Sequence, residues 1–490
     1  MKNIIGIFFL FFLGTSTLLS QDFDDLPGVD AVYFEDIKSI EYRILGNDDQ
    51  ADPTAQIGAL NEEIAKLKKR YSTEEDPDKQ TSLQDDINTK QRQLNTVYDD
   101  KMERDKWRLK LAAPLSTMPI VNLNAGQTIY WAFDDLNEEP TRYSYTIIPF
   151  NWDWSHRLDV ATSEYLDGFS YSEINEFVFP ELTVTNYTAQ RFSFPNNEIK
   201  PTISGNYLLV VYETNSEEVA FTRRVFVARQ EFAFVDDIRD NSFDRDSLQN
   251  INFTISYPEI YDQLAPARDV KVVVLQNGRY DNARSIEKPA LVMNSRLRYG
   301  YQDKIGFKPG KEFRYIMMQT LDYPQLGTEF VNRNKDNYEV YLKPQEERSY
   351  HPNFFYRDLN GKFVTMNGVQ NEEPGDPDYA HVYFTFYQDR PYYKADLYVV
   401  GKLTDWQFKD EFRLSYNNRE GRYEGEALLK QGYYDYYYAL KQDGSDQIDI
   451  DRTEGHAFQT SNDYTVLVYY TPPNGRFDKL VATKTLSINY

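Results

Sequence analysis

Residues 143–148 read Tyr-Ser-Tyr-Thr-Ile-Ile, and their side chains alternate between two faces with a period of two. Such alternation is typical of a β-strand that buries one face. Similar short stretches, separated by Asn, Gly and Pro residues, occur at 120–123, 128–133, 177–179, 191–194, 207–212 and 220–228. Strands at this spacing predict a β-sandwich, and residues 37–45 add a further strand before it.

A helical pattern interrupts this sandwich at residues 46–114. Asp52-Pro53 is typical of the start of a helix, with Asp as the N-cap and Pro at the first helical position. Asp76-Pro77-Asp78 then divides the helical pattern into two stretches. The apolar residues of both stretches recur mostly at spacings of three and four, as in a coiled coil: Ile57, Leu60, Ile64, Leu67 and Tyr71, then Leu83, Ile87, Leu94 and Val97. We therefore expect an inserted antiparallel α-helical hairpin, which is either a solvated surface element or a projecting arm that contacts a partner.

Two further β units follow the sandwich. The apolar strand 269–275 ends at Asn277-Gly278, a strong signal for a tight hairpin turn. A Pro- and Asp-rich connector at 371–378 precedes the strands of the last unit, which are expected at 381–386, 397–400, 422–429 and 433–440. The predicted fold is all-β, with three consecutive immunoglobulin-like β-sandwich domains at residues 21–229, 230–370 and 371–490.

The composition excludes several classes of function. The chain has 490 residues, with 54 Lys and Arg against 77 Asp and Glu, so its net charge is −23. Repulsion from phosphate groups makes nucleic acid an improbable partner. The chain has no cysteine, which excludes disulfides, thiolate metal sites and cysteine nucleophiles. Residues 46–110 carry 15 acids and 12 bases, so −20 of the charge lies outside the hairpin.

No pattern of catalytic or metal-binding residues stands out. The four histidines are far apart in sequence, which excludes local zinc-ligand spacings. The acidic stretch 443–451 suggests calcium but lacks the ligand spacing of an EF-hand, so a solvated hairpin loop is the better interpretation. The two carboxylates of a glycosidase can come from segments that are distant in the sequence, so a glycosidase function stays open at this point. We expect no catalytic residue, no metal site and no cofactor.

The first twenty residues are typical of a secretory signal peptide. Lys2 provides a positive start, residues 4–13 are apolar apart from Gly6, and small or polar residues lead to Ser20. The apolar core has about ten residues, whereas a helix that crosses a bilayer needs about 20. We therefore expect cleavage near Ser20 and an exported protein that is soluble or peripheral to a membrane.

Several motifs together resemble a known family. They lie at 163–169, 204–209, 274–283, 401–406, 429–434 and 462–470, and they include Gln276-Asn277-Gly278-Arg279 and Gly401-Lys402-Leu403-Thr404-Asp405-Trp406. As a set they look like the plug proteins of the type IX secretion system, and the likeness covers about 30–45 and 115–490. The helical hairpin at 46–114 departs from the usual family pattern.

The resemblance implies a structural role rather than an enzymatic one. Plug proteins of this kind lie at the periplasmic face of the outer membrane and cap a very large β-barrel translocon when no substrate is in transit. The implied partner is that outer-membrane β-barrel protein, and contact with the membrane is only peripheral, through the partner. A barrel of this size encloses an aqueous channel, so it must be closed when it is idle.

An alternative function comes from the last unit, which resembles immunoglobulin-like glycogen-binding modules through 401–406 and 432–438. Exposed Trp406 and neighbouring tyrosines can stack on sugar faces, which would make the chain an exported glycan-binding protein. Trp406 can equally pack in a core or an interface. Trp152 and Trp154 flank Asp153, and alternation places both rings on one face, in the core or on a partner surface. These three tryptophans are the candidate interaction residues.

Overall fold

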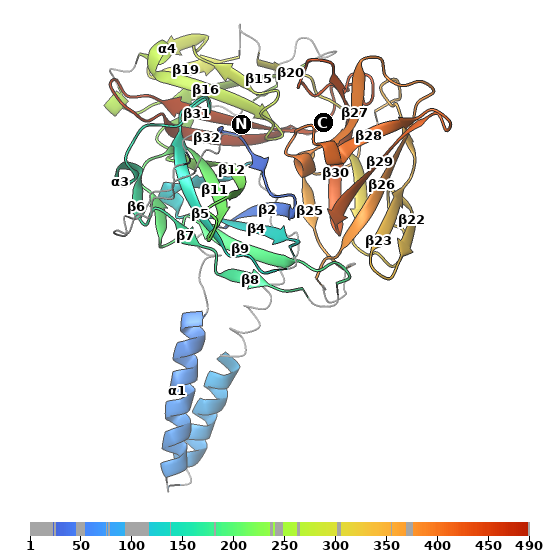
Figure 1. Cartoon of the computed structure of the whole chain (residues 1–490). Coiled ribbons are helices and arrows are strands. Elements are labelled where there is room, and N and C mark those ends of the chain that lie inside the picture. Colours follow the sequence, from blue (N-terminus) through green and yellow to red (C-terminus); the bar gives the residue numbers. More distant parts are fainter. Residues whose placement is uncertain are drawn as a thin grey trace, which may run out of the picture.

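The computed structural model describes residues 23, 26–45, 54–74, 76, 79–93, 117–137, 139–180, 183–235, 239–240, 248–261, 265–300, 305–353, 355–368 and 376–488. The chain is mostly β, with several antiparallel sheets, one barrel-like sheet that is nearly closed, and a pair of helices near the N-terminus (Figure 1). The expected signal peptide lies outside the described residues. Within them, no helix combines the length and the apolar character needed to cross a membrane.

The first unit is a sandwich of two sheets. One sheet has the order β1-β12-β11-β5-β7, with β3 parallel to β12, and the other has the order β2-β4-β9-β8. Its main strands are β2 (Ile37–Leu45), β4 (Thr128–Asp135), β5 (Tyr143–Phe150), β9 (Thr188–Phe194), β11 (Gly205–Glu213) and β12 (Val219–Ala228). Shorter strands are β1 (Ala31–Val32), β3 (Ile120–Asn122), β7 (Ser172–Glu173) and β8 (Glu176–Val178), and β6 (Leu166–Gly168) pairs with β10 (Ile199–Pro201). Aromatic and aliphatic side chains of both sheets, such as Trp131 and Tyr145, fill the space between them.

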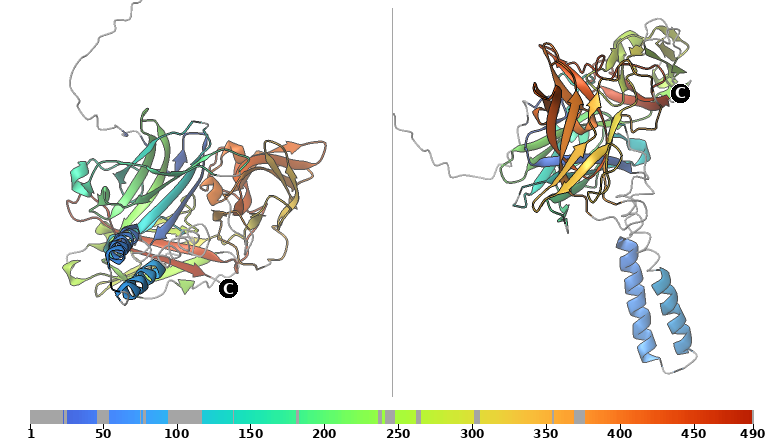
Figure 2. Two further views of the ribbon diagram at one scale, coloured as in Figure 1. Left: turned by 90° about the horizontal axis from the view of Figure 1, so that it is seen from below. Right: turned by 90° about the vertical axis from the view of Figure 1, so that its right-hand side faces the viewer.

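The helical hairpin projects from this sandwich and lies apart from the rest of the body (Figures 1 and 2). It consists of α1 (Thr54–Thr73) and a second helix at residues 79–93. Ile64, Leu83 and Ile87 are buried, as the heptad pattern predicts, and Lys90 forms an ion pair with Glu63 at 2.8 Å. The predicted helix start at Asp52-Pro53 and the seam positions Leu94 and Val97 lie outside the described residues. The expected helix pair is therefore confirmed.

The second unit closes with strands from the far end of the chain. Its first sheet joins β13 (Ala233–Phe234), β14 (Arg239–Asp240), β15 (Gln249–Ser256), β18 (Leu291–Met293), β19 (Arg296–Tyr299) and β20 (Ile305–Phe307). Its second sheet has the order β17-β16-β31-β32, built from β17 (Arg284–Ile286), β16 (Val270–Gln276), β31 (Asn462–Tyr470) and β32 (Lys479–Ile488). Figure 1 shows β31 and β32, in red, beside the yellow-green β16.

The third unit is one curved sheet around its own core. The strand order is β21-β30-β27-β28-β29-β26-β23-β22, with β24 on β26 and β25 on β30. The strands are β21 (Arg314–Met318), β22 (Thr328–Arg333), β23 (Tyr338–Leu342), β24 (Gln345–Glu346), β25 (Phe363–Thr365), β26 (Tyr379–Tyr387), β27 (Ala395–Val400), β28 (Arg413–Asn417), β29 (Arg422–Lys430) and β30 (Gly432–Gln442). The inward side chains of these strands, Phe384 and Tyr436 among them, form one cluster.

The strand pairing departs from the consecutive order that the sequence predicts. Strands β21 to β25 lie before residue 371 but pair with the third unit, whereas β31 and β32 lie after it and pair with the second. The physical reason is β16, which is buried on both faces and therefore needs partners that cover both faces and both edges. Residues 462–470 provide one of those partners, because β31 is equally apolar. The third unit is thus inserted between the strands of the second. This arrangement corrects the expected domain boundary between residues 370 and 371.

Candidate functional site

Trp406 lies in a turn where the units meet. It follows β27 and η4 (Lys402–Thr404), and both Asp405 and Trp406 have positive φ angles, of 54° and 57°. Only 6% of the indole is exposed, because Phe313 packs on it with ring centroids 5.9 Å apart and the Arg279 guanidinium lies 4.7 Å from its centre. A side chain at Gly361 would clash with the ring at 2.5 Å. The indole is therefore not available to stack on a sugar face.

Trp154 is also an interior residue. It follows β5 with a positive φ of 65°, and its ring packs against Phe150 and Phe226. The Arg224 guanidinium lies 5.2 Å from this ring and 4.1 Å from the ring of Tyr280, so the cation is shared between two aromatic faces. The Trp154 side chain thus joins the first sandwich to the turn after β16.

Trp152 is partly buried and packs against the same cluster as Trp154, although residues 152–154 form a turn rather than an alternating strand. This cluster contains apolar side chains from β11 of the first unit and from β16 and β31 of the second, including Leu208, Val273 and Leu467. The two sheets therefore pack face to face, and the two tryptophans lie at the border of that contact. Packing between units explains both residues without a partner surface.

Buried ion pairs connect the units to one another. The Asp405 carboxylate lies 3.2 Å from Arg223 and 3.3 Å from both Lys402 and Lys409. Burial alone would raise the pKa of Asp405, but these three cations hold it well below its usual range. Lys430 of the third unit likewise contacts Asp134 of the first at 2.5 Å, with both side chains buried. Because a broken buried pair leaves an uncompensated charge, these contacts hold the units in one arrangement.

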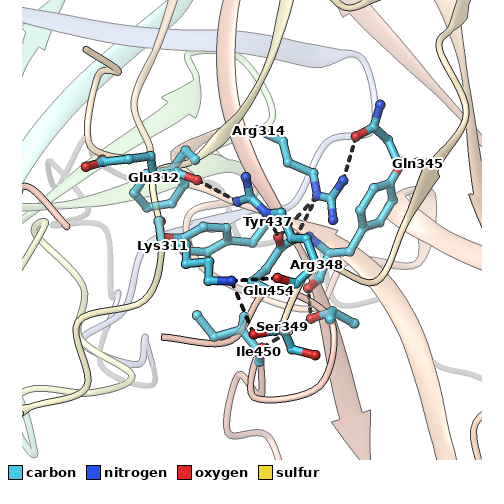
Figure 3. A network of polar contacts seen from close by, with 12 residues as sticks. Lys311, Glu312, Arg314, Gln345, Arg348, Ser349, Tyr437, Ile450 and Glu454 are labelled. Carbon is cyan, nitrogen blue, oxygen red and sulfur yellow. Dashed lines mark hydrogen bonds and ion pairs between the residues drawn. The ribbon is translucent and has the colours of Figure 1, made fainter. Parts of the chain in front are cut away.

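A second polar network lies inside the third unit (Figure 3). Glu454 is fully buried, and its carboxylate accepts hydrogen bonds from Arg314 Nε at 3.0 Å, from Arg348 Nε and from the Tyr438 amide at 2.9 Å. Burial acts to raise the pKa of this carboxyl, but the two arginines keep it below its ordinary value. Nearby, Lys311 Nζ donates to backbone carbonyls, one of them that of His351 at 2.8 Å. The network fixes the chain before β26 against the turn after β30.

Glu312 lies beside this network, and its backbone carbonyl accepts a hydrogen bond from Arg348 Nη2 at 2.5 Å. One carboxyl oxygen accepts from the Ser461 amide at 3.2 Å, and the other has no hydrogen-bond partner in the described part of the chain. Burial, and then the negative charge of Asp358, raise the pKa of Glu312 to about 8. Burial also raises the pKa of Asp358 and, further, that of Asp435. The carboxyl groups in this corner of the third unit therefore keep their protons to a higher pH than exposed carboxyl groups do.

Glu312→Gln is expected to flatten the dependence of stability on pH. The folded chain keeps the Glu312 proton between pH 4.5 and about 8, where the unfolded chain has lost it. Stability is therefore highest on the acid side of this window and falls as the pH rises through it. The glutamine variant should gain about 1–3 kcal/mol in free energy of unfolding near pH 8, because an amide needs no such proton. Urea unfolding at several pH values measures how the free energy of unfolding changes with pH in the wild type and in the variant. The matched control is the exposed Glu420→Gln, and a slope that is the same in wild type and Glu312→Gln would contradict the assignment.

Two polar cavities of about 440 and 420 Å³ lie along the junction of the units. The first contains His456, whose Nδ1 accepts from the Gly310 amide at 3.0 Å while Nε2 contacts Asp451 at 2.8 Å. Both ring nitrogens are thus engaged, and the imidazole has none left to act as a base on a substrate. Among the described residues, no group of three His, Asp or Glu side chains is placed to hold a metal ion.

The exposed apolar side chains of the first unit gather where both of its sheets end. Strand β7 is the last strand of one sheet and β8 the last of the other, and the chain between 169 and 179 links them. We call residues 169–179 the rim segment. Its exposed apolar residues are Phe169, Tyr171, Phe177, Val178 and Phe179. A strand at 177–179 was predicted, but the exposure of its side chains was not. The signal for that exposure was a run of three apolar residues without alternation.

A sequence family matches part of this chain. The family described as the first domain of type 9 secretion system plug proteins matches residues 100–229, which contain the rim segment and most strands of the first unit. Over residues 100–229, this match confirms the resemblance that the sequence motifs indicated. A search of curated proteins gives no match to the chain.

Solved structures show a likeness in fold. A crystal structure of a hypothetical protein from Parabacteroides merdae ATCC 43184 is 23% identical, with a TM-score of 0.75, and the alignment covers 95% of this chain and 100% of that one. This likeness extends over all three units. The C-terminal domain of the AgI/II polypeptide BspA from Streptococcus agalactiae is 9% identical, with a TM-score of 0.13, over 77% of this chain and 96% of that one. Dimeric latent PorU from Porphyromonas gingivalis is 9% identical, with a TM-score of 0.12, over 76% of this chain and 32% of that one. The last two scores support no conclusion.

Proposed function

We propose, from the premise that residues 100–229 belong to the family of first domains of type IX secretion system plug proteins, that this chain closes the type IX translocon. Membership of this family implies plugging of the translocon, and the family is generally non-catalytic. The family match is the single observation that carries the proposal. The partner that we propose is the large outer-membrane β-barrel translocon protein, bound without covalent bonds from the periplasmic side.

The construction of the body supports this role. A stopper must span an opening without deforming, and here buried pairs such as Arg223–Asp405 and Lys430–Asp134 connect separate units. It must also leave when substrate arrives, which requires an interface that is more polar than that of an obligate complex. The net charge of −23 favours a basic surface on the partner and a salt-sensitive contact.

The finer parts of the proposal concern location and organisation. We place the chain at the periplasmic face of the outer membrane, after removal of residues 1–20, and expect no enzymatic activity. We interpret the first two units as immunoglobulin-like sandwiches, the first ending near residue 229. The helix pair, about 30 Å long at 1.5 Å per residue, is interpreted as a two-stranded coiled-coil arm.

The glycan-binding alternative loses its main residue, because Trp406 is buried. Tyr341 and Tyr383 stack on each other with ring centroids 4.6 Å apart, so one face of each of these rings is covered. No observation on the described surface favours glycan binding over plugging.

The proposal is tested by purifying the full-length tagged chain from detergent-solubilised envelopes of its own host. We expect it to retain a large outer-membrane β-barrel protein, identified by mass spectrometry, at about 0.05 M salt and to release it at about 0.5 M. Deletion of the gene should raise outer-membrane permeability to a small dye. No barrel protein at low salt, together with unchanged permeability, would rule out the plug function.

A variant without residues 50–112 separates the hairpin from the body in the same experiment. Retention of the barrel protein by this variant would assign docking to the β units, whereas its loss from a variant with unchanged circular dichroism would assign docking to the hairpin. Either result leaves the plug function standing, because the full-length chain is measured in parallel.

A further inference from the structure

The rim segment leaves a strand edge unpaired. Strand β8 pairs with β9 on one side only, and no strand in the described part of the chain pairs with its other edge. All three of its residues, Glu176, Phe177 and Val178, are exposed, so neither face of this strand is covered. An edge of this kind presents backbone N–H and C=O groups that can pair with another chain.

The aromatic side chains of the rim segment lie next to this edge. Phe169 is 66% exposed, Phe177 49% and Phe179 52%, and the last two rings are in edge-to-face contact at 5.6 Å. Buried Ile174, between β7 and β8, anchors the segment to the sandwich core. The rings are thus held in place but left in water, which costs free energy unless a partner covers them.

The charge of the segment indicates which partner fits. Residues 166–180 contain Asp167, Glu173 and Glu176 but no Lys or Arg. An added strand that carries apolar residues together with Lys or Arg would cover the rings and place its cations near Glu173 and Glu176, the second of which already lies opposite Arg191 of β9. A strand with Asp or Glu at the same positions would be repelled.

A second exposed edge has the opposite charge and serves as a reference. Strand β18 is the last strand of its sheet, and its residues Leu291, Val292 and Met293 are all exposed. Lys288 and Arg296 flank it, so a basic partner strand would be repelled there. The rim segment, unlike β18, lies within the family match and at the end of the body from which the hairpin projects (Figure 1).

We propose that the outer edge of β8, together with the rim aromatics, is the docking strand for an extended segment that carries alternating basic and apolar residues. This inference rests on the proposed function, in which the segment belongs to the translocon protein. The added strand pairs its backbone with β8, places apolar side chains on Phe177 and Phe179, and directs its cations toward Glu173 and Glu176.

The test uses the double variant Phe177→Lys/Phe179→Lys in the full-length chain. Its matched control is Leu291→Lys/Met293→Lys, which makes the same change at the other exposed edge. All four positions are exposed, so both variants should fold. The rim variant should retain at least about tenfold less translocon protein than wild type, because two aromatic anchors are lost. The control should stay within about twofold of wild type.

A defined probe gives a second readout that needs no translocon. We expect an octapeptide of alternating Lys and Val to bind the wild type and the β18 control but not the rim variant, and a Glu–Val octapeptide to bind none of them. Equal binding of both peptides, or binding of Lys–Val that the rim variant retains, would overturn the inference. Translocon retained equally by the rim variant and wild type would also overturn it while the plug function stands. A wild type that retains no translocon would count against the plug function instead.

Discussion

Replacing Glu454 with glutamine is expected to lower the free energy of unfolding by about 3–5 kcal/mol, because a buried ion pair that loses one partner leaves the other charge uncompensated. The carboxylate is fully buried and contacts Arg314 at 3.0 Å, with Arg348 on its other oxygen. Glutamine keeps the shape but removes the charge, so two largely buried guanidinium groups lose their counter-ion. Urea denaturation followed by circular dichroism measures the loss.

The control for this variant is Asp396→Asn at a surface ion pair. Asp396 and Arg413 are 2.8 Å apart, but each is about half exposed, so the loss should stay below about 1 kcal/mol. Equal losses in the two variants would show that Glu454 is not the centre of a buried network.

Trp406→Ala should cost a similar amount, about 3–5 kcal/mol, because it empties a large buried site between units. Phe313 and the Arg279 guanidinium pack on the indole and Gly361 lies against it, so an alanine would leave a cavity among them. The control is Tyr393→Ala, since this tyrosine is 82% exposed and should cost less than about 0.5 kcal/mol. A loss below about 1 kcal/mol for Trp406→Ala would mean that the ring is free and would revive glycan binding.

Local patterns in the sequence were sufficient for individual elements of the fold. Alternation identified β5 as a strand, although both of its faces are buried rather than one. Heptad spacing identified the buried seam at Ile64, Leu83 and Ile87. Pairing over long distances was not accessible, because a strand such as β16 is apolar on both faces and carries no information about its neighbours. The sequence therefore predicted three consecutive units, whereas β31 and β32 return to the second.

Functional surfaces were predicted less well for a related reason. The sequence around an aromatic residue in a turn does not show whether its ring faces water or a neighbouring unit. Trp406 and Trp154 therefore could not be assigned to the interior or to the surface before their neighbours were known. Glu454 lies in a stretch that resembles an ordinary loop, and its two arginines come from 140 and 106 residues away. Exposure of the rim segment likewise depends on where both sheets of the first unit end.

The return of β31 to the second unit also sets an order of events for a newly made chain. Val270 pairs with Tyr470, so the sheet around β16 stays open until 200 further residues have been delivered. The inserted third unit has all its strands by Gln442 and can form first. The apolar strand β16 therefore stays without its partner during this interval, and an unpaired apolar strand is prone to aggregation. The chain needs protection from aggregation during this interval, rather than after it has folded.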